Sequence, residues 1–116
     1  MPKSILVADD DETMLDLYAR MFLKTGYSIS RASSFEEAVG LIDANTYDLL
    51  ITDLMFPDRL GDRLVKHFEK KRPGARALIV TGAVSELSPK NSPRVYLQKP
   101  FDYDVFMGEV TRALEN

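Results

Sequence analysis

The stretch Asp48-Leu-Leu-Ile-Thr-Asp-Leu-Met-Phe-Pro57 contains a short apolar run, which ends on the carboxylate of Asp53 and is closed by a proline. Apolar runs of this length between polar residues are typical of strands in a parallel sheet, because helices cover both faces of such a sheet. We therefore interpret residues 49–53 as a buried strand that delivers Asp53 to the carboxyl edge of the sheet. Asp53 is then either a simple strand terminus or a reactive carboxylate.

Four further segments are interpreted as strands: Ile5–Ala8, Tyr27–Ala32, Ala77–Thr81 and Val95–Lys99. Residues 5–8 and 77–81 are almost entirely apolar, which predicts that they lie in the middle of the sheet beside residues 49–53. Residues 27–32 and 95–99 contain more polar side chains, as edge strands with one solvated side do.

Between these strands the apolar residues recur with helical spacing. We predict helices over Thr13–Lys24, from a capping box at Ser34 to Asn45, over Asp62–Lys71, and after the cap residue Asp102. Repeated alternation of strand and helix predicts a parallel α/β fold. The expected architecture is a flavodoxin-like (βα)5 three-layer sandwich with strand order 2-1-3-4-5.

The segment Gly82–Arg94 is short for a connection that includes a helix, and it contains Pro89 and Pro93. Proline disfavours a regular helix interior because it lacks the amide hydrogen and clashes with the preceding turn. We predict a shortened or irregular fourth helix, of about one turn near Val84–Leu87, or none.

The composition limits the classes of function. A chain of 116 residues with 45% hydrophobic and 28% charged residues is expected to form a single globular domain over residues 1–116. The net charge of −3 argues against direct binding to nucleic acid, and the absence of cysteine excludes disulfides and thiolate metal sites. No signal peptide or membrane span matches the sequence, so a cytoplasmic protein that does not contact the membrane is expected.

Four of the five predicted strands end on a group that can act on a phosphate or a metal. Asp9 and Asp10 follow the first strand, Asp53 ends the third, and Thr81 and Lys99 end the fourth and fifth. With strand order 2-1-3-4-5, ligands bind at the carboxyl edge between the first and third strands. Clustered carboxylates repel one another, and a hard divalent cation such as Mg²⁺ or Mn²⁺ relieves that repulsion. A carboxylate is also a competent nucleophile for phosphoryl transfer.

The chain resembles the receiver domain of bacterial two-component response regulators, of the chemotaxis-regulator type, over nearly its whole length. The residues that carry the resemblance are Asp9-Asp10, Asp53 with Pro57 and Gly61, Thr81, and Tyr96-Leu97-Gln98-Lys99-Pro100. The resemblance implies a cytoplasmic phosphoprotein that catalyses only its own phosphorylation and dephosphorylation. It also implies a sensor histidine kinase or a histidine phosphotransfer protein as phosphodonor. An output domain or partner protein would read the signal, and a homodimer is compatible with the resemblance.

The resemblance also implies individual roles. Asp53 would be the phosphoacceptor, while Asp10, Asp53 and the backbone carbonyl of Met55 would ligate Mg²⁺, with Asp9 acting through water. Thr81 and Lys99 would hold the phosphoryl oxygens. Tyr96 would turn inward as Thr81 moves, which makes this pair the expected conformational switch.

Two other functions are also compatible with these residues. The domain is a receiver-like interaction module that is never phosphorylated, or it is a small phosphatase of the haloacid-dehalogenase type. In the phosphatase reading, residues 9–13 supply the pattern Asp-x-Asp-x-Thr, with Asp9 as nucleophile and Asp11 as general acid. A flavin-binding flavodoxin is least favoured because the loop after the first strand is acidic, whereas a phosphate-binding loop must attract anions.

Overall fold

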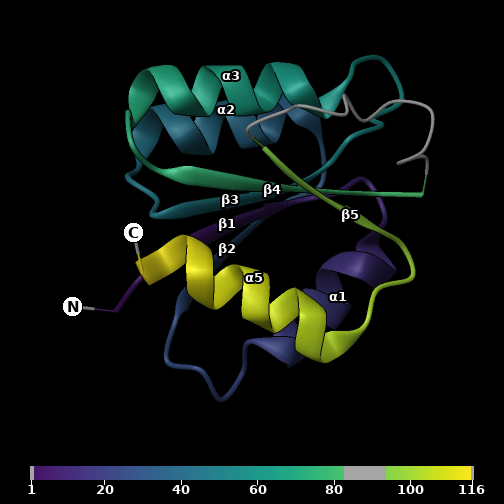
Figure 1. Ribbon diagram of the computed structural model, residues 1–116. Helices are drawn as coiled ribbons and strands as arrows, with labels where there is room; N and C mark the ends of the chain where they lie inside the picture. Colours follow the sequence, from purple (N-terminus) through teal and green to yellow (C-terminus); the bar gives the residue numbers. More distant parts are fainter. Residues whose placement is uncertain (1, 83–93, 116) are drawn as a thin grey trace.

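The computed structural model of the protein describes residues 2–82 and 94–115. Strands and helices alternate from β1 to β4, and β5 and α5 follow after the residues that are not described (Figure 1). The elements are β1 (Ser4–Ala8), α1 (Glu12–Met21), β2 (Ser28–Ala32), α2 (Phe35–Ala44), β3 (Leu49–Asp53), α3 (Gly61–Lys71), β4 (Arg76–Thr81), β5 (Val95–Gln98) and α5 (Tyr103–Glu115). The predicted fourth helix near residues 84–87 lies outside the described residues.

The five strands form one parallel sheet with the order β2-β1-β3-β4-β5, which confirms the prediction. Helices α2 and α3 cover one face of the sheet, and α1 and α5 cover the other, so the molecule has three layers (Figure 1). Strands β1, β3 and β4 are almost completely buried, whereas β2 and β5 at the two edges are only partly buried. The difference in polarity between the strands therefore predicted their positions correctly.

Side chains alternate between two cores because successive residues of a strand point to opposite faces. We call these the α1/α5 core and the α2/α3 core. The buried residues of the α1/α5 core include Ile5, Val7, Leu15, Tyr18, Phe22, Leu49, Ile51, Leu78, Val80, Phe106 and Val110. Those of the α2/α3 core include Leu6, Ala8, Phe35, Ala38, Leu50, Phe56, Leu64, Phe68 and Ile79. The same alternation directs residues 9 and 53 to the α1/α5 side of the sheet, and residue 81 to the α2/α3 side.

The observed ends of helices α1 and α3 differ from the predicted bounds by one to three residues. Helix α1 ends at Met21 and not at Lys24. Beyond Met21, the Leu23 amide donates to the Arg20 carbonyl and the Thr25 amide donates to the Phe22 carbonyl. These bonds span three residues and not four, so the chain leaves the α-helical conformation here. Gly26 follows with a φ of 82°, which is the left-handed conformation that glycine adopts after a helix. Helix α3 begins at Gly61, one residue before the predicted start.

The capping pattern predicted at the start of α2 is present. The Ser34 hydroxyl accepts a hydrogen bond from the Glu37 amide at 3.1 Å, and the Glu37 carboxylate accepts one from the Ser33 amide at 2.6 Å. Because these bonds satisfy amides near the helix start, the local sequence sets where α2 begins. Among residues 2–82 and 94–115, no helix is both long and apolar enough to cross a membrane.

Candidate functional site

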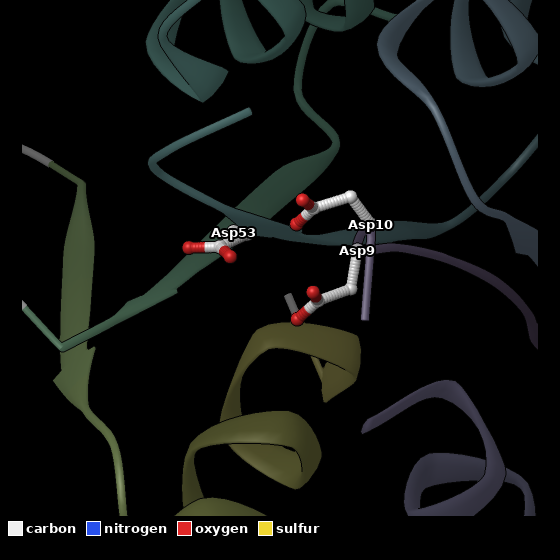
Figure 2. Close-up of side chains that lie close together, drawn as sticks. All are labelled: Asp9, Asp10 and Asp53. Carbon is white, nitrogen blue, oxygen red and sulfur yellow. The ribbon is translucent and has the colours of Figure 1, made fainter. Parts of the chain in front are cut away.

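Three carboxylates meet at the carboxyl edge of the sheet. Strands β1 and β3 pair in parallel with Ala8 opposite Thr52, so Asp9 and Asp53 leave the two strands side by side. One oxygen from each of Asp9, Asp10 and Asp53 lies within 4.8 Å of the others. Figure 2 shows the Asp10 side chain directed toward Asp53, with the Asp9 carboxylate next to them. The sequence predicted this cluster, and the parallel register brings it together.

Lys99 places a positive charge in the cluster. Its ammonium group donates hydrogen bonds to Asp9 Oδ2 at 2.7 Å and to Asp53 Oδ2 at 3.3 Å. The Lys99 amide donates to the Thr81 carbonyl at 2.9 Å, which continues the pairing of β4 and β5 and holds the lysine at this edge. Burial alone would lower the pKa of Lys99, but the hydrogen bond to Asp9 and the charge of Asp53 outweigh it and raise the pKa. The ammonium form is therefore the stable one.

Asp9 is completely buried, and both of its oxygens have donors. Asp9 Oδ1 accepts from the Asp11 amide at 2.9 Å, while Oδ2 accepts from Lys99. A buried carboxylate is tolerated only when it is paired and hydrogen-bonded in this way. The Asp11 side chain is used differently, because it caps α1 by accepting from the Thr13 amide at 3.0 Å. That arrangement disfavours Asp11 as the general acid of the phosphatase alternative.

Asp53 is partly exposed at the end of β3. Burial raises the pKa of its carboxyl group, the charge of Lys99 lowers it, and the charge of Asp9 raises it, with a net upward shift. Asp53 Oδ1 accepts a hydrogen bond from the Met55 amide at 3.3 Å. The other oxygen faces Lys99, so Asp53 lies between a cation and two carboxylates. Such an environment is typical of functional carboxylates.

The loop between β3 and α3 requires glycine at position 61. The Gly61 amide donates to the Leu54 carbonyl at 2.6 Å, which brings the start of α3 against the end of β3. A Cβ atom on Gly61 would lie 1.9 Å from the carbonyl oxygen of Asp53, which is far inside contact distance. The family resemblance singled out Gly61, but the physical reason for glycine at this position is visible only in this close approach.

Arg59 anchors the same loop to α2, and sequence reasoning missed it. Its guanidinium lies 4.6 Å from the centre of the Phe35 ring and pairs with the Glu36 carboxylate. Phe35 packs edge-on against Phe56 with 5.9 Å between the ring centres. An arginine near an aromatic residue carries no distinctive spacing, so the contact could not be identified before the fold was known.

The predicted switch pair lies on the α2/α3 side of the sheet. Thr81 is buried at the end of β4. Tyr96 is partly buried, packs against the α2/α3 core and pairs in register with Ile79, two residues before Thr81. Thr81 and Tyr96 thus belong to adjacent strands and the same face, while the inward turn of Tyr96 stays a prediction.

The acidic cluster fits a hard divalent cation. Mg²⁺ and Mn²⁺ prefer oxygen ligands and commonly use one or two carboxylates with a carbonyl and waters. Asp9, Asp10 and Asp53 offer oxygens within 4.8 Å of one another, and Lys99 is paired with two of them, Asp9 and Asp53. The Met55 carbonyl stays a predicted ligand. The hydrogen bond from Met55 to Asp53 Oδ1 involves the Met55 amide and not its carbonyl.

The five-stranded parallel sheet of order β2-β1-β3-β4-β5, with an acidic cluster at its carboxyl edge, defines a flavodoxin-like protein. The family model described as the response regulator receiver domain matches residues 5–111. The chain therefore belongs to the response regulator receiver domain family of two-component systems. This confirms the predicted family.

Curated relatives match along nearly the whole chain. The transcriptional regulatory protein GlrR of Escherichia coli K12 is 30% identical over 98% of this chain and 27% of its own length. The response regulator receiver protein CpdR of Brucella abortus is 28% identical over 97% of both chains. The chain thus spans about a quarter of GlrR but nearly all of CpdR.

Solved structures agree with the fold. The response regulator TrrA of Thermotoga maritima, in complex with Mg²⁺ and BeF, superposes with a TM-score of 0.83 at 30% identity, over 97% of this chain and 99% of that chain. A CheY-like receiver domain from Methanospirillum hungatei gives a TM-score of 0.85 at 24% identity, over 99% and 95% of the two chains. The second likeness supports the fold alone.

Proposed function

We propose that residues 1–116 act as one receiver domain that accepts a phosphoryl group on Asp53 in a reaction that depends on Mg²⁺ or Mn²⁺. The observation that carries the proposal is the convergence of Asp9, Asp10 and Asp53 with the Lys99 ammonium at one sheet edge. Three carboxylates and a lysine at this spacing are costly to assemble without a ligand. In this proposal the domain catalyses only its own phosphorylation and dephosphorylation.

The reaction forms an acyl phosphate. An Asp53 carboxylate oxygen attacks the phosphorus, the bond from phosphorus to the donor atom breaks, and the donor leaves with that electron pair. Lys99 moves from Asp9 Oδ2 and Asp53 Oδ2 onto a phosphoryl oxygen, and the Thr81 hydroxyl binds another. When bound, the divalent cation neutralises charge between the phosphoryl group and the carboxylates. Asp10, Asp53 and the Met55 carbonyl would hold that cation, and Asp9 would act through water.

The conformational response passes through Thr81 and Tyr96. Movement of Thr81 toward the phosphoryl group leaves space on the α2/α3 side of the sheet, and Tyr96 turns into it. The register of β4 and β5 supports this coupling, because the two residues are on adjacent strands with their side chains on one face. The equilibrium shifts because the phosphoryl group makes charged hydrogen bonds in only one of the two states.

The proposed partners follow from the family. The phosphodonor is a sensor histidine kinase or a histidine phosphotransfer protein, and an output domain or partner protein reads the Thr81–Tyr96 state. A homodimer is one form of that response. We propose a cytoplasmic location and no direct contact with nucleic acid or the membrane. The structure of TrrA with Mg²⁺ and BeF supports the metal requirement by relationship.

Phosphorylation of the purified protein tests the proposal. We expect acetyl phosphate with MgCl2 to add one phosphoryl group, and peptide mapping to place it on Asp53. Asp53→Asn should abolish the modification, whereas Asp58→Asn, which changes an exposed aspartate of the same loop, should leave it intact.

Other outcomes identify the alternatives. No modification under any donor and metal condition would favour the interaction module. Steady release of phosphate from phosphomonoesters that Asp9→Ala abolishes and Asp53→Asn does not would favour the phosphatase.

A further inference from the structure

The hydroxyl of Tyr18 is buried, and no described residue forms a hydrogen bond with it. Tyr18 lies on α1 and is 1% exposed, and its oxygen makes no hydrogen bond with any residue in the described ranges. A buried hydroxyl without a hydrogen bond destabilises the folded state, because water bonds to that hydroxyl in the unfolded chain. Because most buried polar groups in proteins are hydrogen-bonded, the unsatisfied Tyr18 hydroxyl needs an explanation.

Tyr18 lies on the same side of the sheet as the reacting groups. It belongs to the α1/α5 core, which is the side to which strand alternation directs Asp9 and Asp53. Burial raises the pKa of Tyr18 most, and the charges of Asp9 and Asp53 raise it further. The phenol therefore lies within electrostatic range of both carboxylates and remains a protonated donor.

The ring of Tyr18 also contacts the segment that carries Lys99. It stacks on Phe101, two residues after Lys99, with 6.3 Å between the ring centres, and on Phe106 at 5.7 Å. Phe101 and Phe106 stack on each other at 4.6 Å. The phenol is thus held against the turn from which Lys99 extends to Asp9.

We propose that Tyr18 is a positioning residue whose hydroxyl donates a hydrogen bond to the Asp9 carboxylate when Lys99 leaves Asp9 for a phosphoryl oxygen on Asp53. In the metal-free protein, Asp9 Oδ2 already has the Lys99 ammonium at 2.7 Å, so the hydroxyl has no role there. Departure of Lys99 removes the charged donor to Asp9 Oδ2, while the Asp11 amide still donates to Oδ1 of this fully buried carboxylate. Tyr18 then supplies the replacement and stabilises the phosphorylated state.

This inference rests on the proposed phosphorylation of Asp53, and Tyr18→Phe tests it because it removes only the hydroxyl. We expect the metal-free variant to be at least as stable as the wild type in urea denaturation, since an unpaired polar atom is lost. Its affinity for beryllofluoride with Mg²⁺, a phosphoryl analogue, should fall about tenfold, the effect of one hydrogen bond to a charged group. Binding can be followed by ¹⁹F NMR.

Tyr27→Phe is the matched control, because Tyr27 packs on the same core through Phe22, with 6.1 Å between the ring centres. It should leave both measurements unchanged. Wild-type affinity in Tyr18→Phe would overturn the inference while leaving the proposed function intact. A loss of affinity with an equal loss of metal-free stability would also overturn it, because the hydroxyl would then be structural. Failure of the wild type to bind beryllofluoride would overturn both proposals.

Discussion

The Lys99 ammonium lies 2.7 Å from Asp9 Oδ2 and 3.3 Å from Asp53 Oδ2, although Lys99 and Asp9 are 90 positions apart in the sequence. Asp9 is fully buried, and Lys99 is partly buried. The Lys99 ammonium therefore already neutralises part of the negative charge of Asp9 and Asp53. Any metal that binds the three carboxylates acts beside this lysine and against its repulsion.

Lys99→Ala should destabilise the metal-free protein by about 3–5 kcal/mol, because it leaves the Asp9 carboxylate buried without its charged partner. Saturating MgCl2 should restore part of that loss, since a ligand that binds only the folded state stabilises it. Urea denaturation with and without MgCl2 measures both effects. Lys24→Ala, at an exposed lysine after α1, should change neither. A Lys99→Ala loss that MgCl2 does not reduce would contradict a shared site for lysine and metal.

Gly61→Ala should lower the stability by about 2–4 kcal/mol, because its Cβ would lie 1.9 Å from the Asp53 carbonyl oxygen and force the backbone apart. Phosphorylation of Asp53 should fall with it. Gly40→Ala is the matched control, since a Cβ on Gly40 of α2 meets no atom within 4 Å. That substitution should raise the stability by about 0.5–1 kcal/mol through better helix propensity. Similar thermal shifts for the two variants would refute the clash.

Arg59→Ala should loosen the loop between β3 and α3. The arginine contacts Phe35 and Glu36, and its carbonyl accepts from the Phe56 amide at 2.9 Å. Because the side chain is partly exposed, a stability loss of only about 0.5–1 kcal/mol is expected. Hydrogen exchange at the Phe56 and Gly61 amides should become faster. Arg63→Ala, at an exposed position of α3, should leave these amides unchanged, and equal effects would rule out a specific anchor.

The pair of Asp43 and His67 should make the stability depend on pH. Asp43 Oδ1 lies 2.7 Å from His67 Nε2 and 3.5 Å from the Lys71 ammonium, and the hydrogen bond to His67 is the largest cause that lowers the pKa of Asp43. A carboxyl group with a lowered pKa in the folded state stabilises the fold above its unfolded pKa of about 3.9. That contribution disappears as the pH falls through the lower folded-state value.

Asp43→Asn should therefore be less stable than the wild type near pH 5, and the difference should vanish at about pH 2. Urea denaturation across this range measures the difference, with Asp104→Asn in the first turn of α5 as control. A difference between wild type and Asp43→Asn that does not change with pH would show that the pair is not linked to folding.

The order of the elements, the strand order and the position of the site at the carboxyl edge could all be predicted from the sequence. Apolar runs and polar ends are local features, and the rules for parallel sheets convert them into topology. Asp9, Asp10, Asp53, Thr81 and Lys99 could be selected because each stands at or just after the end of a strand. Helix ends such as that of α1 were less predictable, because they depend on how the last turn tightens.

The contacts between these segments could not be predicted, because they depend on how the folded chain packs. The bond of Lys99 to Asp9, the approach of Gly61 to the Asp53 carbonyl and the orphan hydroxyl of Tyr18 depend on distances across the sheet edge. In the sequence, Tyr18 is one apolar position of an amphipathic helix among several. The Tyr18 hydroxyl becomes informative only once packing shows that it is buried, that no residue of the described ranges bonds to it, and that the charges of Asp9 and Asp53 act on it. Burial and charge act through space and leave no pattern along the chain.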